Sequence, residues 1–288
     1  MLSRWSRVVA RISTAESRGK ILGFMNGESG LIKRNYAKVA AFESVDSVDK
    51  GFDNGGVPKV KLDKMFWSSP SSLALAKDSP LRIEEPHYEG IRRFMLKLML
   101  FYSKQSKSIR CANVVYKRVL TQVERPVIYD VFNLEKTFKT TYSLLVLHMW
   151  LCLRRLKGEG EEGVEFGQYV YEIYNHDLEL RVSKAGVNLL LTKWMKDLEK
   201  IFYGNIVAYD AALLPEAGKD DLVKVLWRNV FTDDPESEPS DAARHVVQAM
   251  ARYVRHEVNC LSLTDKEAML SGNFMFTPLE IPLGKTVA

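Results

Sequence analysis

The chain has little of what disulfide frameworks and metal sites require. Its three cysteines, Cys111, Cys152 and Cys260, are odd in number and far apart, and no two of them form a Cys-x-x-Cys pair. This pattern argues against a disulfide scaffold and against a thiolate metal site. The five histidines form neither a His-Glu-x-x-His motif nor the repeated Glu-x-x-His motif of a di-iron bundle. We therefore expect free, buried cysteines in a reducing compartment, and no metal or other cofactor.

Catalytic motifs are also missing. We find no Gly-rich phosphate loop, no nucleophile elbow and no Ser/His/Asp set, so we predict that the protein is not an enzyme. His148 lies between Leu147 and Met149, and we expect it to be a core histidine hydrogen-bonded to a neighbour. One alternative stays open. A helical enzyme or carrier acting on a quinone or lipid would have a hydrophobic pocket, with His148 or the Tyr209-Asp210 pair at its mouth.

No hydrophobic run is long enough to cross a membrane. Residues 142–153 carry no charge, and Arg154 and Arg155 follow at once. Twelve helical residues reach about 18 Å, whereas a bilayer core is about 30 Å thick. A helix that is apolar on all sides is normally buried, so this run predicts the central helix of a helical core.

Excess charge is confined to one end. Residues 1–36 contain seven basic and two acidic residues, which accounts for the whole formal net charge of +5. The balanced remainder does not support a general nucleic-acid-binding surface, and we expect no DNA partner. Two interpretations of a local basic stripe stay open: it contacts RNA or anionic lipid, or it is a solvated helix face. The stripe comprises Arg92, Arg93, Lys97, Lys104, Lys107, Arg110, Lys117 and Arg118.

The N-terminus has the composition of a targeting segment. Its first fifteen residues contain no acid, and Leu2, Trp5, Val9 and Ile12 share one helical face opposite three arginines. This predicts a mitochondrial transit peptide over residues 1–36, the alternative being a retained helix that lies on a membrane surface. The sequence from Arg34 to Ala37 resembles a plant mitochondrial processing site, with cleavage between Tyr36 and Ala37.

Beyond this segment we predict an all-α protein with a single compact helical domain. Residues 37–88 are rich in Ser, Asp, Gly and Pro and are expected to form a flexible arm, in which Met65-Phe66-Trp67 either docks on the core or anchors a partner. The helical domain spans 89–278, and a tail covers 279–288. Helices are expected at 91–102, 108–124, 134–157, 166–182, 187–213, 220–231, 241–260 and from a Thr264 cap to Gly272, with a loop at 158–163.

Several polar side chains lie beside aromatic residues in these helices. Trp, Tyr and Arg anchor many protein interfaces, although they also join helices within a core. Asp177 and Arg181 are four residues apart and are expected to form an ion pair. The candidate partner-binding residues are His148, Trp150, Arg154, Arg155, Asp177, Arg181, Tyr209, Asp210, Trp227, Arg228 and Asn229.

An ordered set of segments resembles the ubiquinol–cytochrome c chaperone family. The set consists of 147–151 with 154–156, 171–174 with Asp177 and Arg181, 202–204 through 209–210, 221–222 through 226–231, 253–255, and 271–274 with Phe276. It covers the predicted helical domain, and its order is more specific than any one segment. Two departures stand out. Tyr142 replaces the family's usual Trp, and Ala211 replaces a usual glutamate, which puts any role of that carboxylate in doubt.

The resemblance implies a non-catalytic chaperone for assembly of respiratory complex III. Such a factor would bind and stabilise newly synthesised cytochrome b, together with a small partner assembly factor and the mitochondrial ribosome. It would be located in the mitochondrion, peripherally on the matrix side of the inner membrane, and the processing site points to a plant member.

Overall fold

In the computed structural model, the residues described are Leu62, 65–84, 88–186, 189–232, Asp234 and 237–279. The predicted transit peptide, the cleavage site at Tyr36 and Ala37, most of the residues between 37 and 64, and nearly all of the predicted C-terminal tail lie outside them. The described part is all-α, as predicted. Its one β-type pairing is an isolated bridge between Ala74 and Phe274.

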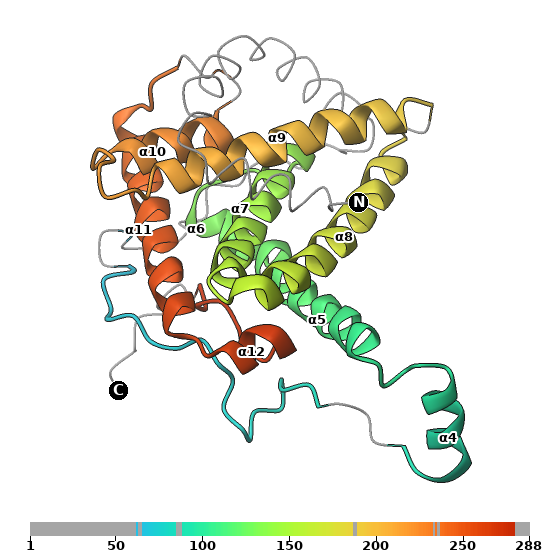
Figure 1. The fold of residues 1–288 in the computed structure, drawn as a ribbon. Coiled ribbons are helices and arrows are strands. Elements are labelled where there is room, and N and C mark those ends of the chain that lie inside the picture. Colours follow the sequence, from blue (N-terminus) through green and yellow to red (C-terminus); the bar gives the residue numbers. More distant parts are fainter. Residues whose placement is uncertain are drawn as a thin grey trace, which may run out of the picture.

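The helices form a bundle with one projecting arm (Figure 1). In chain order they are α4 (Gly90–Leu98), α5 (Lys104–Glu124), α6 (Pro126–Val131), α7 (Phe138–Lys157), α8 (Gly160–Lys184), α9 (Leu191–Ala211), α10 (Asp221–Leu226), the π-helical turn η3 (Trp227–Phe231), α11 (Asp241–Leu263) and α12 (Lys266–Ser271).

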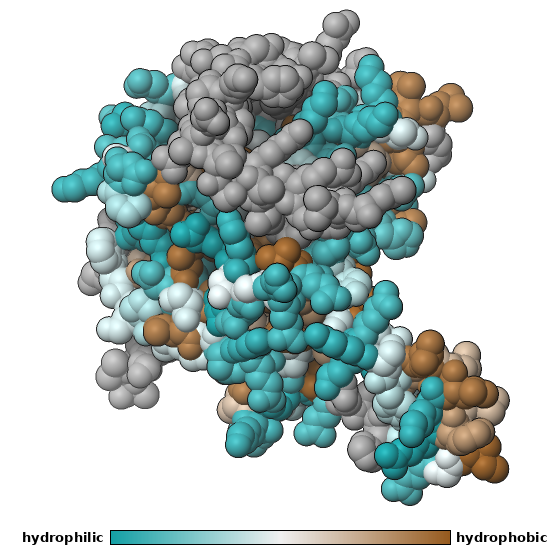
Figure 2. Space-filling model, viewed as in Figure 1, coloured by the Kyte–Doolittle hydropathy of each residue, from teal (hydrophilic) through white to brown (hydrophobic). Residues whose placement is uncertain are grey.

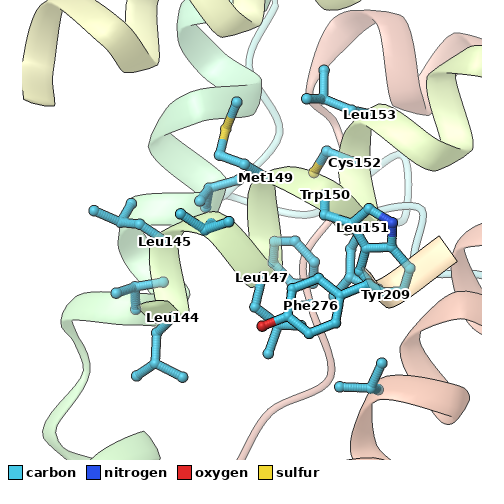
Figure 3. Packing of buried hydrophobic residues seen from close by; sticks show 14 of the residues in the cluster. Leu144, Leu145, Leu147, Met149, Trp150, Leu151, Cys152, Leu153, Tyr209 and Phe276 are labelled. Carbon is cyan, nitrogen blue, oxygen red and sulfur yellow. The ribbon is translucent and has the colours of Figure 1, made fainter. Parts of the chain in front are cut away.

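Helix α7 is the centre of the bundle. It packs against α5, α8, α9, α11 and η3, which surround it on all sides. All residues of the uncharged run 142–153 are buried, which confirms the prediction of a central core helix. Leucines from several faces of α7 contribute to the core, and Tyr209 and Phe276 pack among them (Figure 3). At its start, Thr137 and Thr140 form a reciprocal capping box that satisfies the first backbone N–H groups.

The turn between α7 and α8 is shorter than predicted. Only residues 158–159 separate the two helices, because Gly160 adopts φ +69° and lets the chain reverse at once. Glu161 and Glu162 then lie in the first turn of α8, where the positive end of the helix dipole favours them. Gly163 allows the close contact, since a Cβ atom there would lie 1.9 Å from the Leu156 carbonyl oxygen.

Two other helix ends differ from the prediction, one at Pro126 and one at Thr264. Pro126 was predicted to mark only the end of a helix, but it also opens α6 as its first residue, a position that needs no backbone N–H. Thr264 was predicted to cap α12, but Asp265 accepts the N–H of Ala268 instead. The Thr264 hydroxyl donates to the Cys260 carbonyl and accepts from the N–H of Leu73.

The segment 65–84 lies against the bundle. The Phe66 ring is 5.2 Å from that of Tyr253 and 6.2 Å from that of Phe132. The Leu75 N–H donates to the Asn273 carbonyl at 2.8 Å, and further bonds join Leu73 to this same C-terminal segment. Met65 and Phe66 thus dock on the core, while Trp67 stays largely exposed. No helix of the described part is long and apolar enough to span a bilayer.

Candidate functional site

One polar cluster forms where α7 meets the last turn of α9. We call Trp150, Arg154, Tyr209 and Asp210 the Asp210 cluster. The Trp150 Nε1–H donates to Asp210 Oδ1 at 3.0 Å, and Arg154 Nη1 donates to the same oxygen at 2.6 Å. The Trp150 and Tyr209 rings are 5.0 Å apart. All four are among the candidate residues predicted from the sequence, but their grouping is not, because helical spacing relates only residue 150 to residue 154 and 209–210 lie on another helix.

The cluster changes from buried to accessible over one helical turn. Trp150 and Tyr209 are fully buried, whereas the side chains of Arg154 and Asp210 are 39% and 24% exposed. Burial raises the pKa of Tyr209, so its hydroxyl stays protonated at physiological pH. The buried aromatics therefore fix a rim formed by the Arg154–Asp210 ion pair, and only this rim is open to a partner.

The π-helical turn η3 lies against α7 next to this cluster. The side chain of Asn229 on η3 partly offsets the effect of burial on the pKa of the Tyr209 hydroxyl. Trp227 donates its indole N–H to the Ser237 carbonyl at 2.7 Å and stacks on Phe231, so its ring fastens the following loop. Arg228 is exposed. Because π-helical turns are rare and recur at functional sites, η3 and the Asp210 cluster together form the candidate site.

Asp177 and Arg181 form a second cluster, which joins α8 to α5. Arg181 Nε donates to Asp177 at 2.5 Å, which confirms the predicted ion pair, and Nη2 donates to Glu124 at 2.8 Å. Asp177 also accepts the Tyr116 hydroxyl at 2.6 Å. Burial and this hydrogen bond raise the pKa of Tyr116. The contacts are those of a tie between two helices.

Arg155 points into the protein, unlike Arg154. Its side chain donates to Glu159 and to the carbonyl oxygens of Leu261 and Thr264. These acceptors lie in the α7–α8 turn and at the end of α11. Arg155 thus satisfies carbonyl groups that a helix end leaves without an intrahelical donor.

His148 lies inside the core. Its Nδ1 is 2.7 Å from the Leu144 carbonyl, which can only accept, so Nδ1 carries the proton and Nε2 accepts the Tyr253 hydroxyl at 2.9 Å. Gln122 in turn donates to Tyr253. Burial lowers the pKa of His148 to about 4 despite the bond to Leu144. The histidine is neutral, fully partnered and enclosed, as a packed core histidine should be.

These observations count against the quinone or lipid enzyme. Both nitrogens of His148 are occupied within a filled core, and Phe276 packs edge-on against the imidazole. In the described ranges, no group of three His, Cys, Asp or Glu side chains is arranged to hold a metal ion. The predicted basic stripe is interrupted, since Arg118 is buried and donates to the carbonyls of Gly272 and Leu81.

Sequence reasoning missed two features. Glu257 is a fully buried carboxyl on α11, and it accepts the backbone N–H of Thr277. The other is the exposure of α4: a helix was predicted at 91–102, but its apolar side chains are exposed and not packed on the core. The helical spacing of those side chains was visible, but spacing alone does not tell which apolar faces find a partner within the fold.

A helical domain with an enclosed core histidine and a polar rim backed by buried aromatic residues fits a binding protein. Comparison with known proteins identifies the kind. Residues 130–276 match the model of the ubiquinol-cytochrome C chaperone family, which is just over half of the chain, and the chain belongs to this family. Its members are assembly chaperones, so the protein is a chaperone and not an enzyme.

Named relatives agree with this assignment. The chain is 27% identical to ubiquinol-cytochrome c reductase complex assembly factor 1 of Homo sapiens, over 76% of this chain and 72% of that protein. It is 24% identical to the mitochondrial protein CBP3 of Saccharomyces cerevisiae, over 54% of this chain and 46% of that one. The crystal structure of the Cbp3 homolog from Brucella abortus shares the fold, with a TM-score of 0.54 at 26% identity, and covers 64% of this chain and 97% of that chain.

Proposed function

We propose that this protein is a mitochondrial chaperone for assembly of ubiquinol–cytochrome c reductase that binds newly synthesised cytochrome b and stabilises it. The family match over residues 130–276 carries the proposal, and the assembly-factor names of the relatives support it. The filled core at His148 fits a protein that acts by binding a client.

The proposed mechanism is stoichiometric. The chaperone covers an apolar or membrane-proximal part of cytochrome b, and it dissociates when the subunits of the mature complex compete for that surface. A small partner factor and the mitochondrial ribosome complete the proposed set of partners. We propose a peripheral position on the matrix side of the inner membrane, where a newly made membrane subunit would emerge.

Accessible members of the candidate site would make the direct contacts. Arg154, Asp210 and Arg228 are open to a partner, while Trp150 and Tyr209 hold the rim from within. His148 is enclosed, so it would reach a partner only if the core opened. Arg155, Asp177 and Arg181 act in the proposal by fixing the helices on which the contact residues stand.

A null line tests the function. We expect loss of the protein to lower assembled complex III and cytochrome b on native gels while other respiratory complexes form normally at first. Normal complex III in the null line would end the proposal. Restoring the line with Arg228→Ala tests the exposed contact residue on η3, and Arg244→Ala is the matched control because Arg244 is an exposed arginine on α11. Only the first variant should restore complex III incompletely.

A further inference from the structure

Helix α4 stands apart from the bundle. It projects beyond the end of α5 (Figure 1), and only sparse contacts join it to the other described helices. Four apolar side chains on it and that of its C-cap residue, Met99, are exposed in the folded chain: Ile91 (83%), Phe94 (67%), Met95 (51%), Leu98 (71%) and Met99 (74%). At 100° per residue they occupy one continuous face. Contiguous apolar surface of this kind marks an interaction site.

The opposite face is basic. Arg93 and Lys97 lie across the helix from Ile91 and Met95, about 200° further around it, and both are exposed. Figure 2 shows the separation, with brown side chains on one side of the projecting lobe and teal ones on the other. From Gly90 to Val123 the chain contains eight basic residues and no acidic one. The charged residues within α4 and its link to α5 are therefore all basic, although the N-cap Glu89 is an exposed acid and Arg118 is buried.

Specific contacts hold the link between α4 and α5 in one conformation. Leu100 adopts φ +56°, an uncommon conformation for a residue with a side chain, and the Phe101 N–H returns to the Leu96 carbonyl at 2.9 Å. The Arg110 guanidinium stacks 3.9 Å from the Phe101 ring centroid and donates to the Phe101 carbonyl at 2.7 Å. Contacts from α5 thus set the direction of α4, which holds its apolar face away from the bundle.

We propose that α4 is a membrane anchor, which lies in the surface of an anionic bilayer with its apolar face inserted. A nine-residue helix is about 13 Å long, far too short to span a bilayer of about 30 Å but sufficient to lie in the interface. An apolar face with Phe, Met, Ile and Leu opposite Arg and Lys is the composition of interfacial helices. Anionic headgroups complement the acid-free stretch 90–123, whereas a neutral bilayer lacks the charge.

This inference deepens the proposed function, since it supplies the element that would hold the chaperone at the inner membrane. It does not depend on the identity of the client. Vesicle binding tests the anchor, and complex III assembly in the null line tests the chaperone role, so failure of either is seen separately.

The first test is flotation of the full chain with vesicles. For the triple variant Ile91→Gln, Phe94→Gln, Leu98→Gln, the partition coefficient onto phosphatidylcholine vesicles that contain cardiolipin should be lower than that of the wild type by a factor of about ten or more. A matched control replaces three exposed leucines elsewhere, Leu180→Gln, Leu189→Gln and Leu190→Gln, and should bind as the wild type does. Arg93→Gln with Lys97→Gln should weaken binding and make it less sensitive to salt.

A second measurement reads the position of α4 directly, whatever other segments bind lipid. A nitrobenzoxadiazole label on Leu98→Cys in a Cys111→Ala background should shift to the blue with anionic vesicles and be quenched by nitroxide-labelled lipid. The same label on Leu189→Cys should not respond. If the label at residue 98 stays in water on vesicles, the proposal is overturned. It is equally overturned if the triple variant binds vesicles normally but loses a protein partner, which would make this face a protein interface.

Discussion

The buried Glu257 on α11 predicts an unusual pH dependence of stability. Its side chain is fully buried, and burial raises the pKa of this carboxyl from 4.5 to about 7 although the Thr277 N–H bonds to it. The folded chain therefore keeps the proton between pH 4.5 and about 7, while the unfolded chain releases it. In that window the unfolded state binds fewer protons, so the free energy of unfolding decreases as pH rises.

The magnitude follows from the shift. A displacement from 4.5 to about 7 corresponds to about 3 kcal/mol of lost stability, which accumulates at about 1.4 kcal/mol per pH unit and is complete above about pH 7. Glu257→Gln keeps the shape and an acceptor oxygen but removes the ionisation. The free energy of unfolding of the variant, measured relative to that of wild type, should therefore be about 2 to 3 kcal/mol higher at about pH 8 than at about pH 5.

His148 opposes this trend in the wild type. Burial lowers the pKa of His148 from 6.5 to about 4, so the unfolded chain binds the extra proton and stability rises with pH between those values. From pH 4.5 to 6.5 the two slopes have opposite signs and similar size. Removing the Glu257 carboxyl should expose the rising slope of His148, which the wild type conceals.

Urea unfolding followed by circular dichroism at several pH values measures this difference. The exposed Glu179→Gln on α8 is the control, because it makes the same change of charge without burial and should leave the pH dependence as in wild type. A constant difference between Glu257→Gln and wild type across the whole pH range would refute the reasoning, whatever the sign of that difference.

Three further predictions concern packing and contacts. Gly163→Ala should destabilise the chain by about 2 kcal/mol or more, since its Cβ would overlap a backbone carbonyl. Gly204→Ala meets nothing within 4 Å and should stabilise the chain by about 1 kcal/mol. Thermal melts of both variants check this pair. Tyr253→Phe removes the donor to the imidazole inside the core and should cost about 1 to 3 kcal/mol in urea unfolding, and a cost near zero would contradict the hydrogen-bond assignment. Asp210→Asn weakens the partly exposed pair with Arg154 and should lower stability by no more than about 1 kcal/mol while reducing client capture, so unchanged capture would remove the rim from the site.

Helical periodicity predicted most of this fold because its signals are local. Burial of the uncharged run 142–153 was predictable without tertiary information, since a helix without a polar face is normally buried in the core. The errors fell at helix ends. Thr264 and Asp265 are both good N-cap residues, but the Thr264 hydroxyl bonds to the Cys260 carbonyl and to the N–H of Leu73, 191 residues away in sequence, and Asp265 caps the helix.

The candidate site was predictable only as a set of residue types. The Asp177–Arg181 pair follows from helical spacing. The pairing of Arg154 with Asp210, in contrast, depends on how α7 crosses α9, and the inward direction of Arg155 depends on carbonyl groups at the end of α11. Exposure of α4 is likewise a tertiary property, because the same amphipathic pattern fits a helix packed on a core.

Capture of newly made cytochrome b tests the central claim most directly. Mitochondria that carry a tagged form of the chain are labelled during a short pulse of organellar translation, and the tagged protein is purified at intervals through a chase. The account predicts that labelled cytochrome b is captured after the pulse and is released as labelled complex III appears on native gels. Complex III that gains its label without cytochrome b passing through the tagged protein would contradict it.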